Sequence, residues 1–257
     1  DKEKILEFSP GCHFLSMSAT PIPRSLQLSL SGVRNISTLL TAPMSRKPII
    51  TNVLYFSKQL IKTIILSEVS RNGQVYIVDN SVNNVKSVSS LISSFFPDFS
   101  ISFLHGSLDK KTINNTMSMF RLKKINILIS TVIIESGIDI PSANTIIINN
   151  AHMFGLSQLH QLRGRVGRSN VQSYAYMLIP KTKKITKDGI SRLKSIKKHS
   201  SLGAGYSLAV EDLQIRGAGS LFGYSQSGQS FVGFEYYSKL LSRAMKNIKY
   251  RGLDFKP

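Results

Sequence analysis

Short apolar runs alternate with longer stretches of helical periodicity along this chain, and this alternation limits its fold more than any other feature. The runs typical of buried strands lie at residues 74–78, 101–104, 126–129, 145–148 and 173–179. Between them, apolar residues recur at helical spacing, as in 60–69 and 82–95. Strands that alternate with helices predict an α/β fold with one parallel sheet covered by helices on both faces. Ligands of such sheets bind at the carboxyl ends of the strands.

The two ends of the chain differ from this middle part. His13–Met17 predicts a strand, Pro21–Leu30 a helix, and residues 31–48 a linker, because they contain Gly32, Pro43 and Pro48. A lysine-rich stretch at 181–199 has a helical apolar face, and Phe234–Tyr250 predicts a closing helix.

Composition excludes several classes of protein. The 257 residues include 33 Lys and Arg against 14 Asp and Glu, which gives a net charge of +19. This charge points to a polyanion, nucleic acid first, although a solvated basic surface from coding bias would look the same. One cysteine excludes a disulfide framework and a thiolate zinc site, and the five histidines show no ligand spacing, so no metal site is predicted. No apolar run approaches the length of a membrane helix and no targeting signal is visible. We therefore expect a cytoplasmic protein with no membrane partner.

The densest chemical signal is Gln158–Arg168, QLHQLRGRVGR. It contains three arginines, and a helical turn would place Arg165 and Arg168 on one face. Guanidinium groups suit a phosphate that is being transferred, and an arginine from across a cleft can stabilise the charge that develops. A basic surface helix explains the spacing equally well. Ser157 is interpreted as the N-cap of this helix.

Two further signals follow predicted strands. In Ser130–Pro141, STVIIESGIDIP, Thr131 and Gly137 could face a phosphate, and Asp139 could hold a ribose hydroxyl or a water. His105-Gly106 follows the strand at 101–104, where a lone histidine is usually structural.

These segments, together with Ser18-Ala19-Thr20 near the start, resemble the superfamily-2 helicases in their order along the chain. The resemblance implies a RecA-like fold in which Arg165, Arg168 and Gln161 act at the γ-phosphate of ATP. It places Gly137 and Asp139 at the nucleotide cleft. It also places Thr131, His105 and Gly106 at the nucleic-acid backbone, and Ser18, Ala19 and Thr20 between the two sites.

The tail narrows the resemblance. Glu211–Gly219, EDLQIRGAG, and the following Gln226-Ser227-Gly228 resemble the translocation motif shared by two bacterial double-stranded DNA translocases. These are the RecG branch-migration helicases and the transcription-repair coupling factors. The motif is a helical hairpin and a loop in which an Arg and a Gln, here Arg216 and Gln226, link nucleotide state to movement on DNA. Strings such as NNAHMFGLSQLHQLRGRVGRS favour the coupling factors.

The departures from this pattern matter as much as the matches. The sequence contains no GxxxxGK[ST] phosphate loop and no DExx box, so ATP and Mg²⁺ would be bound mainly by a first RecA-like domain that is absent here. We expect the end of that domain and a linker at 1–43, the second RecA-like domain at 44–185 and the translocation motif at 186–257. We expect this chain alone to be inactive as an ATPase.

The resemblance implies double-stranded DNA and the first RecA-like domain as partners, and RNA polymerase and nucleotide-excision-repair proteins through other domains. The chain is then a fragment of a larger translocase or a shortened gene product. RecG-like fork remodelling and a basic module that binds nucleic acid without hydrolysis remain the alternatives.

Overall fold

The structure is a computed structural model that describes residues 47–132, 143–167, 170–182, 184–201 and 203–216, with residues 13, 15, 17, 37–39, 240 and 243. The described strands form one six-stranded sheet with the order β1-β6-β5-β2-β4-β3, and every neighbouring pair is parallel. The strands are β1 (Ile50–Tyr55), β2 (Gln74–Asp79), β3 (Ile101–Leu104), β4 (Ile127–Thr131), β5 (Ala143–Ile148) and β6 (Tyr174–Ile179). The predicted parallel α/β fold is confirmed.

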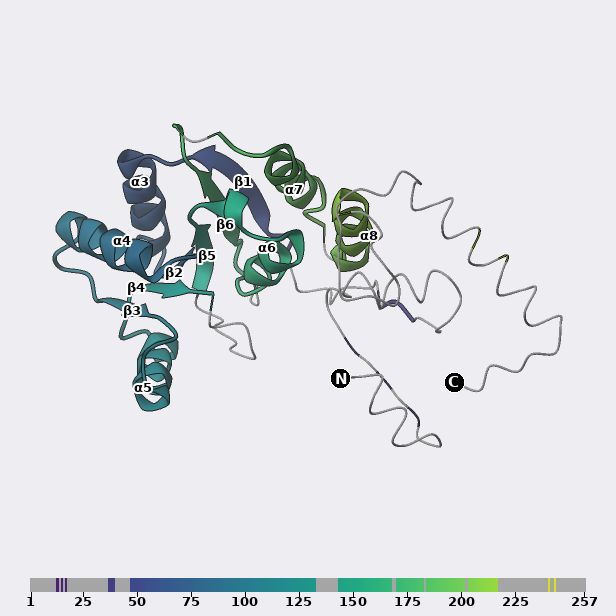
Figure 1. Ribbon diagram of the computed structural model, residues 1–257. Helices are drawn as coiled ribbons and strands as arrows, with labels where there is room; N and C mark the ends of the chain where they lie inside the picture. Colours follow the sequence, from purple (N-terminus) through teal and green to yellow (C-terminus); the bar gives the residue numbers. More distant parts are fainter. Residues whose placement is uncertain are drawn as a thin grey trace.

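Helices cover both faces of this sheet (Figure 1). They are α3 (Lys58–Val69), α4 (Val82–Phe95), α5 (Lys110–Arg121), α6 (Leu156–Arg163), α7 (Lys187–Lys198), α8 (Gly205–Arg216) and the short 3-10 helix η1 (Ala151–Met153). Helices α3 and α4 pack on one face, whereas α5, α6 and α7 pack on the other. Helix α8 lies against α6 and α7.

Three of these helices begin at a polar residue that caps the first turn. The side chains of Ser57, Asp109 and Thr186 accept hydrogen bonds from backbone N–H groups three residues later, at 3.0, 2.9 and 3.1 Å. Donation from Thr112 holds the pKa of Asp109 below its usual value. These caps satisfy N–H groups that have no partner inside the helix.

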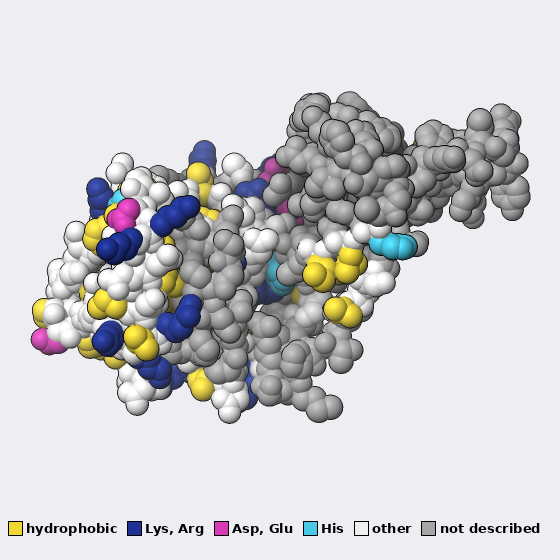
Figure 2. All heavy atoms as spheres, turned by 90° about the horizontal axis from the view of Figure 1, so that it is seen from below, with side chains coloured by type: hydrophobic (Ala, Val, Ile, Leu, Met, Phe, Trp, Pro, Cys, Tyr) yellow, Lys and Arg dark blue, Asp and Glu magenta, His cyan; other side chains and the backbone are white. Residues whose placement is uncertain are grey.

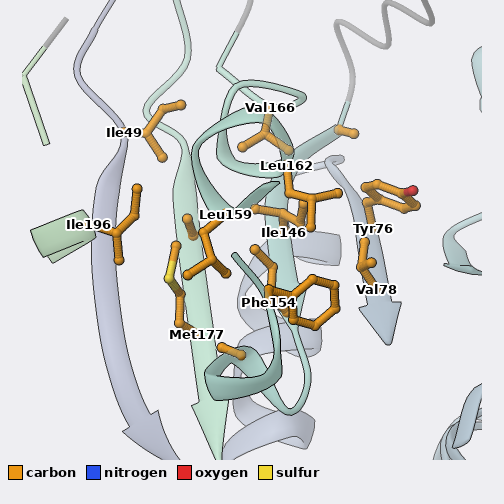
Figure 3. Packing of buried hydrophobic residues seen from close by; sticks show 14 of the residues in the cluster. Ile49, Tyr76, Val78, Ile146, Phe154, Leu159, Leu162, Val166, Met177 and Ile196 are labelled. Carbon is orange, nitrogen blue, oxygen red and sulfur yellow. The ribbon is translucent and has the colours of Figure 1, made fainter. Parts of the chain in front are cut away.

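The central strands β2, β4 and β5 are buried along their whole length, which explains their continuous apolar sequences. Figure 3 shows how one of the two cores is built: Tyr76, Val78, Ile146 and Met177 of the sheet meet Leu159 and Leu162 of α6. The face of the sheet under α6 is therefore a packed support for the segment that carries the arginines.

One strand was not predicted. β1 lies directly after the predicted linker and pairs with β6 at the edge of the sheet. Because it is an edge strand, Ile50, Leu54 and Tyr55 are exposed and Thr51 is buried, so its polarity does not follow the pattern of the inner strands. The predicted strand His13–Met17 and the predicted helices Pro21–Leu30 and Phe234–Tyr250 fall largely outside the described residues. Among the helices that are described, none has the length and apolar character needed to cross a bilayer.

Candidate nucleotide and nucleic-acid site

The helix with the arginine-rich segment begins two residues earlier than the sequence suggests, and it ends before Arg165. Gly155, not Ser157, is the N-cap of α6, and the side chain of Gln158 accepts a hydrogen bond from the Gly155 N–H at 3.1 Å. The helix ends at Arg163, and Gly164 is its C-cap. Arg165 lies in the following turn, where its N–H donates to the Leu162 carbonyl at 3.0 Å. The prediction that a helical turn carries Arg165 is therefore wrong, because Gly164 ends the helix first.

Gln161 and Arg165 nevertheless share one surface hollow. The hollow is lined by Val132, Gln158, Gln161, Leu162 and Arg165. Val132 directly follows β4, so the hollow lies beside the carboxyl end of that strand. Two of the residues predicted to act on phosphate are thus brought together where ligands of parallel sheets bind.

A buried tyrosine of the sheet lies near this turn. The hydroxyl of Tyr76 on β2 lies 2.7 Å from Ser130 Oγ on β4. Burial raises the pKa of Tyr76 to about 12, while the bond to Ser130 and the positive charge of Arg165 act in the opposite direction. The charge of Arg165 is therefore held near the phenol. Sequence reasoning missed Tyr76, because its position inside an apolar strand gives no sign of a polar contact.

Arg163 does not share the role of its neighbour. Its side chain is buried, and its Nη1 donates to the Ile196 carbonyl of α7 at 2.9 Å. Its Nη2 lies 2.9 Å from His160 Nδ1. Burial lowers the pKa of Arg163 to about 10. Of the three clustered arginines, this one fastens α6 to α7.

The ends of β3 and β4 bring two other predicted residues together. Leu104 pairs with Ser130 in the parallel register, so His105 and Thr131 are the next residues on adjacent strands. His105 Nδ1 and Thr131 Oγ1 are both buried, and neither has a hydrogen-bond partner within the described residues. Gly106, beside them, is exposed. Buried polar atoms without partners are costly, so this pair is suited to an incoming hydrogen-bonding group.

A carboxylate that the sequence analysis did not single out organises the same edge. Asp79, at the end of β2, is fully buried. It accepts hydrogen bonds from the Ser81 N–H at 3.1 Å and from the amides of Asn84, Asn149 and Asn150 at 2.9, 2.6 and 3.2 Å. Asn150 has a φ of 50°, in the left-handed region that asparagine tolerates. Asp79 thereby holds the loops after β2 and β5 in place. An acidic residue directly after a buried strand is the signal that could have found it.

The two helices of the tail pack beside α6. Ser157 Oγ donates to Asp212 Oδ2 of α8 at 3.4 Å, and Arg192 Nη2 of α7 donates to the His152 carbonyl at 3.2 Å. His199 Nε2 and Glu211 Oε2, 2.9 Å apart, join the two tail helices. Arg216 is the last residue of α8.

The remaining predicted site residues cannot be placed. Ser18, Ala19, Thr20, Gly137, Asp139, Arg168 and Gln226 lie outside the described residues, as does the side chain of Arg216. Within the described residues, no group of three or more His, Cys, Asp or Glu could hold a metal ion.

Basic side chains outnumber acidic ones on the surface of the described residues seen in Figure 2. In Figure 2, Lys and Arg are spread over the face seen from below and acidic side chains are few. Five of the cations belong to α5 and the turns beside it, where all are exposed: Lys110, Lys111, Arg121, Lys123 and Lys124. This distribution suits a polyanion.

Comparison with known proteins agrees with this geometry. Residues 57–170 match the family described as helicase conserved C-terminal domain. Over 96% of its length the chain is 43% identical to the transcription-repair-coupling factors of Myxococcus xanthus and Escherichia coli, and 44% identical to that of Borreliella burgdorferi. The chain spans only 21–22% of the length of these relatives.

A solved structure with a similar fold is that of RecG bound to a three-way DNA junction. It has a TM-score of 0.66 and 31% identity, and the match covers 88% of this chain and 30% of that one. The sheet described above is that of a RecA-like helicase domain.

Proposed function

We propose a motor function for this chain, because residues 57–170 match the family described as helicase conserved C-terminal domain and the sequence is similar to transcription-repair-coupling factors over 96% of its length. The chain is the second lobe of an ATP-driven double-stranded DNA translocase that couples transcription to DNA repair. The observation that carries the proposal is the position of Arg165 and Gln161 on one hollow beside the end of β4.

Arg165 and Arg168 are the residues of this lobe that act on ATP in this proposal. The second lobe closes over ATP bound by a first lobe, and Arg165 and Arg168 then meet the γ-phosphate with help from Gln161. A guanidinium supplied across a cleft stabilises the charge that develops during phosphoryl transfer. Among the described residues, the lining of the hollow offers an arginine and two amides and no carboxylate, so this part of it suits the outer end of a triphosphate, and Mg²⁺ would be bound mainly by the first lobe. Gly137 and Asp139 complete the nucleotide cleft in this proposal.

The His105–Thr131 pair contacts the DNA backbone. Its two buried polar atoms have no described partner, and a phosphate oxygen can accept from the Thr131 hydroxyl and from a protonated ring nitrogen of His105. The exposed Gly106 lets the backbone approach closely. Contacts of this kind carry no sequence information, so we expect binding that is independent of sequence and sensitive to salt.

The tail helices transmit nucleotide state to DNA. Helix α6, which leads into Arg165, is tied to α7 through Arg163 and to α8 through Ser157. Arg216 ends α8, and we propose that Arg216 and Gln226 convert lobe closure into a step along the duplex. Ser18, Ala19 and Thr20 link the nucleotide and DNA sites from the first lobe. RNA polymerase and repair proteins bind through other domains of a longer cytoplasmic protein.

The test is an ATPase assay with saturating double-stranded DNA, performed on the full-length protein. Arg165→Ala should reduce kcat by about a thousandfold, the size of effect known for arginines of this kind, while the Kd for DNA stays unchanged. Lys62→Ala, on an exposed cation of α3 at the opposite face of the sheet, is the control and should turn over ATP normally. If Arg165→Ala keeps its turnover, the assignment is wrong.

The match to RecG favours a second candidate, the remodelling of branched DNA. A RecG-like protein unwinds a three-way junction without RNA polymerase, whereas a coupling factor displaces a stalled polymerase. A third candidate is a module that binds nucleic acid without hydrolysis. We propose that the 257 residues alone do not hydrolyse ATP, because the sequence lacks the phosphate loop. Robust DNA-stimulated hydrolysis by these residues alone would exclude that third candidate.

A further inference from the structure

A side chain at residue 167 would collide with Ile49, which directly precedes β1. Its φ is +74°, in the left-handed region that favours glycine. A Cβ on Gly167 would lie 2.9 Å from Ile49 Cγ1, 3.3 Å from Ile49 Cδ1 and 3.4 Å from Ser173 Cβ. The turn that carries Arg165 can therefore pack on Ile49 only because residue 167 has no side chain.

Ile49 is itself firmly held. It is 6% exposed, and its carbonyl accepts a bond from Thr51 Oγ1 at 3.3 Å. On either side, the Pro48 carbonyl accepts from Gln172 Nε2 at 2.9 Å and the Ile50 N–H donates to the Ser173 carbonyl at 3.0 Å. Arg71 Nη1 reaches the Gln172 carbonyl at 2.8 Å, which connects this anchor to the end of α3.

The arginine turn is fixed from its other side as well. Val166 is fully buried in the same core as Ile49 and Leu162, and Figure 3 shows Ile49 and Val166 at the same end of that core. Turn hydrogen bonds join Arg165 to Leu162 and Val166 to Arg163, at 3.0 and 3.4 Å. Arg165 thus lies between two anchored points, the end of α6 and the Gly167–Ile49 contact.

We propose that Gly167 and Ile49 are positioning residues for Arg165. Residues 31–48 are the predicted linker to a first lobe, and Ile49 directly follows them. The contact therefore ties Ile49, just before β1, to the arginine turn, so that the position of Arg165 is fixed relative to the sheet. This inference rests on the proposed function, since it assumes that Arg165 acts on ATP held by another lobe.

A side chain at residue 167 should shift the arginine and slow the reaction. The new Cβ forces either the turn or Ile49 to move, because Ile49 Cγ1 is too close to be accommodated. A shift of about 1 Å in a catalytic group can cost about a hundredfold in rate. In the full-length protein with saturating DNA, Gly167→Ala should lower kcat by about ten- to a hundredfold, with little change in the KM for ATP.

Two further variants separate positioning from stability. Asn72→Ala is the matched control: Asn72 has a φ of 59° and is exposed, so alanine there carries left-handed backbone strain without the Ile49 contact. Its kcat should stay within about twofold of the parent, although its melting temperature falls. The double variant Ile49→Ala/Gly167→Ala removes the colliding atoms. It should recover at least about threefold in kcat over Gly167→Ala, even though Ile49→Ala alone lowers the melting temperature.

The outcomes of these assays are distinguishable. If Arg165→Ala retains turnover, the proposed function fails and this inference fails with it. If Arg165→Ala is inactive but Gly167→Ala behaves like Asn72→Ala, only the positioning inference is overturned. It is also overturned if removing the Ile49 side chain gives no recovery of kcat in the double variant.

Discussion

Tyr76→Phe should change both the stability of the domain and the way in which that stability depends on pH. The phenol is buried, and within the described residues its hydroxyl is hydrogen-bonded to Ser130 Oγ at 2.7 Å. At pH 8 the variant leaves the Ser130 hydroxyl buried without that partner, which costs about 1–3 kcal/mol of unfolding free energy.

At alkaline pH the difference in unfolding free energy between the parent protein and Tyr76→Phe should shrink and begin to reverse. The phenol in the folded protein has a pKa of about 12, raised from 10.0 by burial. Between these values the unfolded chain binds fewer protons than the folded one, so unfolding becomes more favourable as pH rises. The stability that the neutral, buried phenol contributes is complete below pH 10 and is lost as the pH approaches 12. Two pKa units correspond to ~2.7 kcal/mol in total, of which ~1.4 kcal/mol is lost by pH 11.

The assay is urea denaturation of the 257-residue chain and its variants at pH 8, 9, 10 and 11. The parent should lose ~1.4 kcal/mol more than Tyr76→Phe between pH 8 and pH 11. Arg163, whose pKa is lowered to about 10, changes stability with pH in the opposite sense, but it is present in both proteins and cancels from the difference. Ser130→Ala keeps the phenol and should keep the alkaline loss. Parallel pH curves for the parent and Tyr76→Phe would refute the reasoning.

Three other predictions follow from the same structure. Gly73→Ala should lower the unfolding free energy by about 3 kcal/mol or more, because its Cβ would collide with the buried Oε1 of Glu68. Gly164→Ala, whose Cβ would meet nothing closer than 3.5 Å, should melt near the parent temperature. Asp79→Ala should cost about 2–4 kcal/mol in urea denaturation, because several amides lose their shared acceptor, and a loss below 1 kcal/mol would contradict that account. The Kd for duplex DNA, measured by fluorescence anisotropy from about 50 to 200 mM salt, should rise steeply and equally for unrelated sequences. A strong preference for one sequence would contradict a backbone contact.

The layout of the sheet could be predicted because its inner strands are buried on both faces. Runs such as 126–129 have no polar face and end where helical periodicity begins, so the order of elements follows directly. Strand β1 escaped this reasoning because its place at the sheet edge leaves Ile50 and Leu54 exposed.

The candidate site, like the sheet, was predicted from the sequence only in part. Arg165 and Gln161 are close in sequence, and the structure places both on one hollow. The roles of Arg163 and Tyr76 depend on partners 33 and 54 residues away, which spacing cannot reveal. The end of α6 was misjudged for a local reason, since Gly164 stops the helix before Arg165.

We propose that this lobe is part of a motor that moves along duplex DNA and hydrolyses ATP. A triplex-displacement assay measures that movement directly. The full-length protein, given ATP and a linear duplex with a labelled third strand bound far from one end, should release the third strand. Arg165→Ala should bind the duplex and release nothing. A parent protein that hydrolyses ATP on the same duplex yet leaves the third strand in place would contradict the account.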